Sequence, residues 1–171
     1  NTAVGTTPTQ ILSTLSVSQS IIYGGSFYIA LARATGTPEN RLDTAGCKNV
    51  AVVSGWNMLS VPVLAADMRK TSLFPGAASN AFAFANGYTA KDTLVNGVGY
   101  WLKFNASSNF PVCGSYLTKR TIPVKAGWNM IGIYDEDIQT SQIISTPSLI
   151  VSSQYYGYSN GYQPATTLVS G

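Results

Sequence analysis

The sequence contains no histidine and few charged residues. Of its 171 residues, 10% are Asp, Glu, Lys or Arg, against about a quarter in an ordinary globular protein. Without histidine, the chain cannot form the Ser-His-Asp or Cys-His systems that activate a nucleophile. It also lacks the glycine patterns of phosphate-binding loops and dinucleotide-binding folds. We therefore expect a protein that is not an enzyme and that uses no cofactor.

Few groups remain that could perform chemistry or bind a metal. The seven carboxylates leave carboxylate catalysis formally open, because glycoside hydrolysis needs only two that are suitably spaced. The run Asp135-Glu136-Asp137 could bind Ca²⁺, but it lacks the ligand alternation and the glycine of an EF-hand loop. We interpret this run as a helix cap or a solvated surface, and we predict no metal site.

The charges are confined to the middle of the chain. None occurs in residues 1–32 or 138–171, and all of them lie between Arg33 and Asp137. Depletion of charge marks the core of an interface, so we interpret both ends as contact surfaces. The alternative is a surface that hydroxyl and amide groups keep soluble. Adjacent basic residues such as Lys119-Arg120 form no clustered footprint, so we predict no nucleic-acid binding.

The cysteines and the polar composition favour an extracellular location. Cys47 and Cys113 would form one disulfide that closes a long loop, as expected in an oxidising compartment. Two buried free thiols are the alternative. No apolar run reaches the ~18 residues of a membrane-spanning helix, so we predict no membrane span. No signal peptide is visible, and Asn1-Thr2 would suit the start of a processed chain.

One pattern recurs along the chain. Gly-Trp-Asn-Met at 55–58 returns at 127–130, and Asn-Gly-Tyr at 86–88 returns at 160–162. Such internal periodicity indicates repeated structural units. We therefore divide the chain into a partial N-terminal repeat with a possible donor strand (1–54), a complete middle repeat (55–126) and a C-terminal repeat that lacks its last strands (127–171).

The two incomplete copies are complementary. Segment 25–31 resembles 98–104, the aromatic strand of the middle copy, and the C-terminal copy stops at Gly171, where that strand would begin. An unpaired strand edge is adhesive. Either the ends close on each other within one chain, or the N-terminal strand completes the sheet of another copy. The residues predicted at this assembly interface are Ile21, Ile22, Tyr23, Phe27, Tyr28, Ile29, Leu31, Tyr162, Leu168 and Val169.

Turn chemistry predicts a mainly β fold. The Asn-Gly pairs at 86–87, 96–97 and 160–161 favour tight two-residue hairpins. We expect tandem, sandwich-like β-sheet repeats with short helices and incomplete terminal repeats. The predicted strands are 50–53, 56–61, 81–85, 100–104, 121–125, 129–134 and 154–158, and the predicted helices are 9–15, 65–74 and 137–145.

Aromatic residues recur at equivalent positions of the pattern. Trp56, Trp101 and Trp128 occupy such positions, and we expect them in the core of the repeats. In a strand, Tyr156 and Tyr158 share a face, so one side of that strand is expected to meet solvent or a partner. Exposed rings can stack on sugars, which makes glycans a possible second kind of partner.

The pattern Gly-Trp-Asn-Met, Asn-Gly-Tyr, Gly-Tyr-Trp-Leu-Lys resembles β-rich repeat modules of secreted and surface proteins of bacteria and archaea. Residues 55–104 carry all of it, and 127–171 carry it up to the missing Gly-Tyr-Trp. The resemblance implies an extracellular, non-enzymatic module. Our leading hypothesis is a structural subunit of an extracellular filament or surface assembly, which polymerises head-to-tail with copies of itself by β-strand complementation. The alternative is a monomeric secreted carbohydrate-binding or adhesion module.

Overall fold

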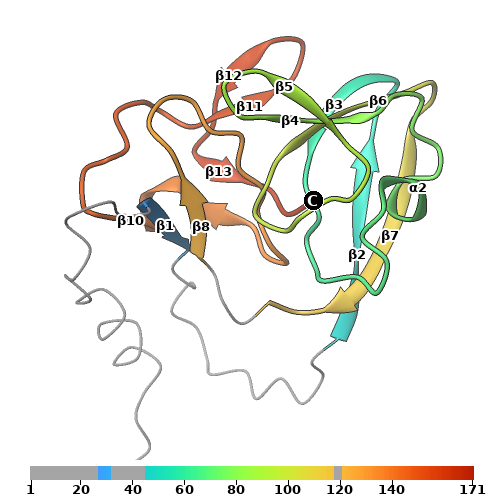
Figure 1. The fold of residues 1–171 in the computed structure, drawn as a ribbon, viewed down its shortest axis with the longest axis horizontal. Coiled ribbons are helices and arrows are strands. Elements are labelled where there is room, and N and C mark those ends of the chain that lie inside the picture. The colour runs from blue at the N-terminus through green and yellow to red at the C-terminus, as the bar shows by residue number, and fades with distance from the viewer. Residues whose placement is uncertain (1–26, 32–44, 118–120) are drawn as a thin grey trace, which may run out of the picture.

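The computed structural model describes residues 27–31, 45–117 and 121–171, and this part of the chain is mainly β, as predicted (Figure 1). It contains one α-helix, α2 (Lys70–Leu73), and one 3-10 turn, η1 (Thr140–Gln142). The helix predicted at 9–15 lies outside the described residues. The strands are β1 (Phe27–Leu31), β2 (Ala45–Val52), β3 (Gly55–Leu59), β4 (Ala81–Phe84), β5 (Tyr88–Lys91), β6 (Tyr100–Phe104), β7 (Ser108–Ser115), β8 (Thr121–Val124), β9 (Ile138–Gln139), β10 (Ile143–Thr146), β11 (Tyr156–Tyr158), β12 (Tyr162–Pro164) and β13 (Thr167–Leu168).

A first core lies between the antiparallel sheet β3-β6-β4-β5 and the long pair β2-β7. Strand alternation sends Tyr100, Leu102 and Phe104 of β6 into this core, where each is at most 2% exposed. Val50 of β2 and Val112 of β7 meet them there. The sheet therefore has one buried inner face and one outer face.

Strands β2 and β7 run antiparallel over eight residue pairs and place Cys47 opposite Cys113. The two cysteines form a disulfide with a Cα–Cα distance of 4.0 Å, which confirms the predicted pairing. Both residues lie on the exposed side of the pair. The disulfide thus ties the two strands together outside the first core.

A second, smaller core lies under the three-stranded sheet β10-β1-β8 (Figure 1). Its buried members are Ile29, Ile122, Ile133, Tyr134 and Ile138. Strand β9 pairs with β13 beside it. In the figure this sheet lies at the left, opposite the pair β2-β7 at the right. The C-terminal part of the chain thus builds its own core together with β1.

The two parts are joined by a close approach of their backbones. The Gly99 N–H donates to the carbonyl oxygen of Met130 at 3.0 Å, and the Gly132 N–H donates to that of Gly97 at 3.1 Å. A Cβ atom on Gly99 would lie only 2.8 Å from the carbonyl oxygen of Ile131. Glycine is therefore required at this contact, which fixes the C-terminal part against the loop before β6.

The Gly-Trp-Asn segments form two turns of the same design. Gly55 has φ +100° and Gly127 has φ +88°, a region that favours glycine. The Asn57 amide donates to the Val53 carbonyl oxygen at 2.8 Å and accepts from the Val53 N–H at 2.9 Å. These turns therefore need Gly and Asn, whereas the hydrogen bonds that close them do not involve the tryptophan side chain.

Several sequence predictions need correction. The helix predicted at 137–145 is wrong, because this segment forms β9, η1 and β10, and β10 pairs with β1. Of the helix predicted at 65–74, only α2 is helical. The strand predicted at 129–134 is reduced to a single bridge between Ile131 and Val98. In each case contacts with distant residues outweigh local propensity.

The hairpin turns are longer than predicted. Three residues, and not two, separate the paired residues Phe84 and Tyr88. The same holds between Tyr158 and Tyr162. Within these loops Asn86 and Asn160 have φ values of 57° and 53°, so the Asn-Gly pairs do supply the positive φ angles for which they were singled out.

Candidate functional site

Strand β1 is the central strand of its sheet. It makes four residue pairs with β10 and four with β8, all antiparallel. Ile29 lies opposite Ile122 on one side and Ser145 on the other, and its side chain is 2% exposed. Both neighbours of β1 come from the C-terminal third of the chain, far from it in the sequence. Without β1, two strand edges and the second core would be uncovered.

The structure separates the residues that were predicted to form the assembly interface. Ile21, Ile22 and Tyr23 lie outside the described residues, whereas Phe27, Tyr28, Ile29 and Leu31 form part of β1. Leu168 of β13 packs against the second core, and the side chain of Val169 is 67% exposed. Tyr162 lies on β12 in a different site, described next.

An open pocket of about 460 Å³ lies on the outer face of the sheet β3-β6-β4-β5. All of its lining residues are aromatic. Each of the four strands of the sheet supplies one of them, and the hairpin β11-β12 supplies the other two. The residues of this aromatic pocket are Trp56, Phe82, Tyr88, Trp101, Tyr158 and Tyr162.

Strand register explains how the sheet presents these rings. Trp101 lies opposite Met58 of β3 and Phe82 of β4, so the three side chains form a row on the outer face. Trp56 lies beside this row, opposite Lys103. Trp56 and Phe82 have ring centroids 6.1 Å apart. The alternation that buries one face of β6 therefore turns its tryptophan outward.

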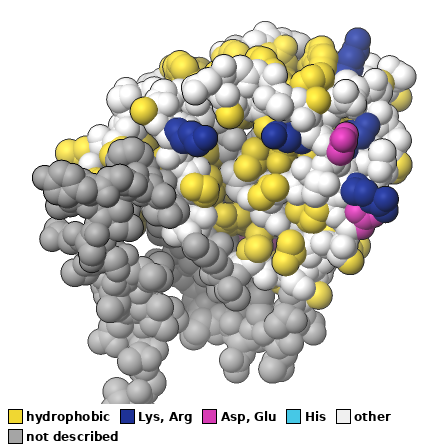
Figure 2. Space-filling model, viewed as in Figure 1, with side chains coloured by type: hydrophobic (Ala, Val, Ile, Leu, Met, Phe, Trp, Pro, Cys, Tyr) yellow, Lys and Arg dark blue, Asp and Glu magenta, His cyan; other side chains and the backbone are white. Residues whose placement is uncertain are grey.

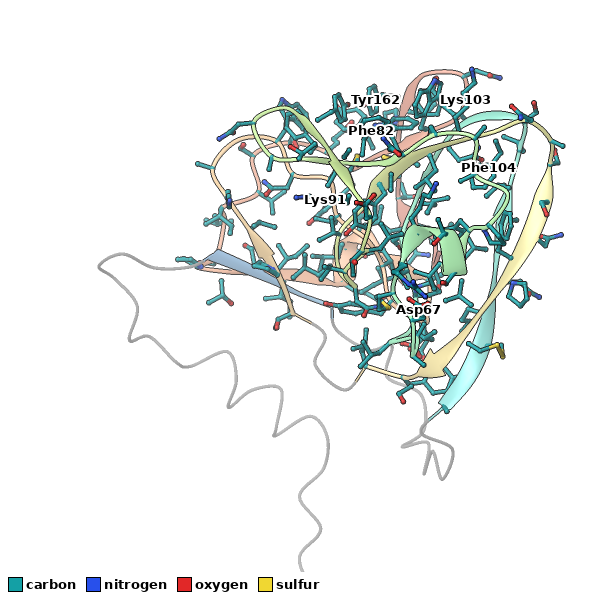
Figure 3. All side chains as sticks on the ribbon, turned by 45° about the vertical axis from the view of Figure 1, so that its right-hand side comes forward. Asp67, Phe82, Lys91, Lys103, Phe104 and Tyr162 are labelled. Atoms are coloured by element: carbon teal, nitrogen blue, oxygen red, sulfur yellow. A yellow bond between two sulfur atoms is a disulfide. The ribbon has the colours of Figure 1, made fainter. Side chains whose placement is uncertain are left out.

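The hairpin β11-β12 packs on this row through its tyrosines. The Tyr158 ring meets Trp101 edge-on with centroids 4.6 Å apart, and Tyr162 meets it at 6.4 Å. Edge-to-face contacts of this kind are favourable for aromatic pairs. Figure 3 shows Tyr162, Phe82 and Lys103 gathered in one region, with Asp67 well apart from them.

Hydrogen bonding within the pocket changes the acidity of one hydroxyl group. A hydrogen bond with Tyr88 and partial burial raise the pKa of Tyr162 above its usual 10.0, and a hydrogen bond with Trp101 opposes this rise. The Tyr162 hydroxyl is therefore neutral at physiological pH. Every side chain that lines the pocket is uncharged, so the site offers ring faces and hydroxyl groups.

The prediction that the three tryptophans lie in the core is wrong. Trp56 is 43% exposed and Trp128 is 67% exposed, and Trp101 is partly buried on the outer face. Beside Trp101, the neighbouring residues Tyr100 and Leu102 face the first core instead. The sequence reasoning also missed Phe82 and Tyr88 as site residues, although the Ala-Phe-Ala-Phe alternation of residues 81–84 is the signal that could have found Phe82.

The acidic residues form other structures. The Asp67 carboxylate accepts hydrogen bonds from Arg69 and Ser72, which hold its pKa well below the usual range. Asp137 accepts a hydrogen bond of 2.8 Å from the Ser170 N–H instead of capping a helix. Asp135 is fully buried. In the described ranges, no three His, Cys, Asp or Glu side chains are grouped so that they could hold a metal ion.

No family model, no curated protein and no solved structure matches this chain. Within the part of the chain that is described, no helix has the length and apolarity needed to cross a bilayer. The disulfide is compatible with a secreted protein.

Proposed function

We propose that this chain is a structural subunit of an extracellular filament, in which β1 of one copy completes the β8–β10 sheet of the next. The observation that carries this proposal is the central place of β1 between two strands of the C-terminal part. The eight residue pairs that hold β1 are ones that the same strand of another copy could make equally well. In a single chain, β1 occupies its own sheet, and in the filament the β1 strand of a neighbouring copy would take the same place.

The connection between β1 and β2 is long enough for such an exchange. Residues 32–44 of the sequence join the two strands. An extended chain covers ~3.3 Å or slightly more per residue, so this connection can span about 40 Å. That is wider than the three-stranded sheet itself, in which neighbouring strands lie ~4.8 Å apart. Exchange of an identical element between copies is a low-cost route to assembly.

The direction of exchange favours growth into a filament. Each copy would donate its β1 and receive another, which is a head-to-tail contact, and such contacts extend without limit unless the rotation closes a ring. The two strands that would receive β1, β8 and β10, contain no charged residue. The contact would therefore depend on apolar burial and backbone pairing, and high salt should leave it intact.

A cysteine pair tests whether β1 is exchanged. Ala30 of β1 lies opposite Ile144 of β10, and the Ile144 side chain is 54% exposed. The full chain would carry both Ala30→Cys and Ile144→Cys. Negative-stain electron microscopy at low and high salt shows whether it forms fibres. The sample is then oxidised mildly and run on a denaturing, non-reducing gel. Exchange between copies predicts a ladder of covalent multimers that disappears on reduction.

The single variant Ala30→Cys is the matched control. It has one added thiol per chain and can form nothing larger than a dimer, so a longer ladder in the double variant needs both cysteines to meet in trans. Fibres whose oxidised chains all migrate as monomers would show that β1 stays in its own chain. Absence of fibres in concentrated wild-type chain would count against assembly itself.

A further inference from the structure

The aromatic pocket joins two parts of the chain that are far apart in the sequence. Trp101 on the sheet and Tyr158 on the hairpin meet at 4.6 Å, and β11 also contacts β3. Ring-on-ring packing therefore shapes the pocket before any ligand arrives. Its volume of about 460 Å³ falls in the range of roughly 300–1,000 Å³ that is typical of small-molecule sites.

Aromatic residues continue beyond the pocket along the same hairpin. Tyr156 lies two residues before Tyr158 on β11, so both side chains share a face of that strand. Trp128 packs against Tyr156 with centroids 6.1 Å apart and is 67% exposed. We call the aromatic pocket together with Tyr156 and Trp128 the aromatic platform. An extended row of rings suits an elongated ligand better than a single small molecule.

So large an exposed aromatic surface needs a partner. Tyr88, Tyr158 and Tyr162 are 56%, 42% and 57% exposed, and contiguous exposed apolar patches usually mark interaction sites. Figure 2 shows hydrophobic side chains spread over one face of the molecule, with only a few charged ones between them. The partner is therefore one that apolar contact holds, and not one that a charged patch attracts.

The polar groups of the platform identify the chemistry of the partner. Its tyrosine hydroxyls are donors and acceptors, and no carboxylate or ammonium group lines the pocket. The faces of aromatic rings carry partial negative charge, which complements the C–H faces of sugar rings. Sugar hydroxyls at the edge of the ring can pair with the tyrosine hydroxyls. A purely lipid or aliphatic partner would make no use of these hydroxyl groups.

We propose that the aromatic platform is a binding site for a neutral, linear oligosaccharide, with one stretch of the glycan in the pocket and the next on Tyr156 and Trp128. The site is independent of β1, because none of its residues belongs to the sheet β10-β1-β8. Loss of glycan binding and loss of assembly can therefore be told apart.

Isothermal titration calorimetry of the full chain with cellohexaose, maltohexaose, mannohexaose and xylohexaose, and with the matching trioses, tests this proposal. Tyr162→Ala removes an exposed ring of the pocket, and Trp128→Ala removes the exposed ring at the far end. Leu149→Ala is the control, because Leu149 is 94% exposed and outside the platform. Circular dichroism and thermal unfolding of each variant verify the fold.

At least one hexaose should bind, and each platform variant should weaken it by about five- to tenfold, which is the contribution expected of one aromatic contact. Trp128→Ala should weaken the hexaose and leave the triose unchanged, since the triose is held in the pocket. Failure of all four hexaoses to bind would overturn the proposal, and so would equal weakening by Leu149→Ala. Platform variants that change the sedimentation of the chain while no sugar binds would reassign the surface to a protein contact.

Discussion

Asn57 and Asn129, which occupy equivalent positions in the two Gly-Trp-Asn segments, make the same three hydrogen bonds. Each amide donates to the carbonyl oxygens four and two residues before it, and each accepts from the N–H four residues before it, at distances of 2.8 to 3.0 Å. One side chain thus closes a whole turn. The motif is structural, and the turn accounts for the glycine and the asparagine of both segments.

Removing either amide should open its turn. We expect Asn57→Ala to lower the free energy of unfolding by about 1–3 kcal/mol, because three hydrogen bonds are lost around a partly exposed turn. Urea denaturation measures the change. Asn57→Asp keeps the acceptor but places an anionic oxygen beside the carbonyl oxygens of Val53 and Gly55, so its loss should be at least as large. Equal stability of Asn57→Ala and wild type would show that solvent replaces these bonds at no cost.

The contact between the two parts of the chain depends on Gly132, because glycine has no Cβ atom. A Cβ atom on Gly132 would lie 2.6 Å from the carbonyl oxygen of Val98, so Gly132→Ala must push the two backbones apart. We expect a loss of about 1–3 kcal/mol in unfolding free energy. Gly157→Ala is the control, since its Cβ would meet nothing within 4 Å. A neutral Gly132→Ala would mean that the two parts are free to separate.

The disulfide should contribute mainly through the unfolded chain. Its cysteines have a sequence separation of 66, for which loop entropy gives about 4 kcal/mol of stabilisation. Because both cysteines lie on an exposed face, mild reductant should reach them without unfolding. Denaturation of the chain with and without reductant measures the effect, and Cys47→Ser with Cys113→Ser should match the reduced chain. A reduced chain as stable as the oxidised one would contradict this estimate.

The buried strand residue Ile29 should be among the most sensitive positions of the second core. Ile29→Ala leaves a cavity among Ile122, Ile133 and Ile138, and we expect a loss of about 2–4 kcal/mol. Leu149→Ala, at a 94% exposed position, should change stability by less than about 0.5 kcal/mol. Chemical denaturation compares the two. Similar small losses in both variants would indicate that β1 contributes little to this core.

Alkaline pH should destabilise the fold through Tyr100. Burial raises the pKa of its hydroxyl above the usual 10.0, and a hydrogen bond from the Val95 N–H, which donates at 2.8 Å, partly offsets this. A group whose pKa is higher in the folded state stabilises the fold fully below its unfolded pKa. That stabilisation is lost as the pH rises above 10 towards the folded pKa.

The comparison with Tyr100→Phe isolates this effect from other titrating groups. The free energy of unfolding of the wild-type chain should fall more steeply above pH 10 than that of the variant. Parallel curves for the two proteins would mean that the hydroxyl ionises equally easily in both states.

The sequence predicted correctly those elements whose structure depends on residues close together in the chain. The strand predicted at 100–104 coincides with β6, whose nearly continuous run of aromatic and apolar residues follows the Gly-x-Gly segment 97–99. The disulfide followed from an even cysteine count. The segment 137–145 was wrongly predicted as a helix. Its residues 143–145 pair with β1, which lies near the opposite end of the sequence, so no local pattern marks them as a strand.

The aromatic platform could be predicted only in part. The Gly-Trp-Asn motif recurs around Trp56 and Trp128, but its recurrence does not say whether a side chain faces the core or solvent. The face that Tyr156 and Tyr158 share was predicted from strand alternation, and both are exposed. That Tyr158 packs on Trp101 depends on how a hairpin folds back over a sheet, which no short-range pattern encodes.

The central place of β1 also has a mechanical consequence. When force pulls β1 along its own axis, the ladders to β8 and to β10 are loaded together, and all eight residue pairs share the load in shear. An edge strand peeled sideways would instead lose its pairs one after another. Tension along a strand held in this way therefore meets the strongest resistance that so short an element can offer.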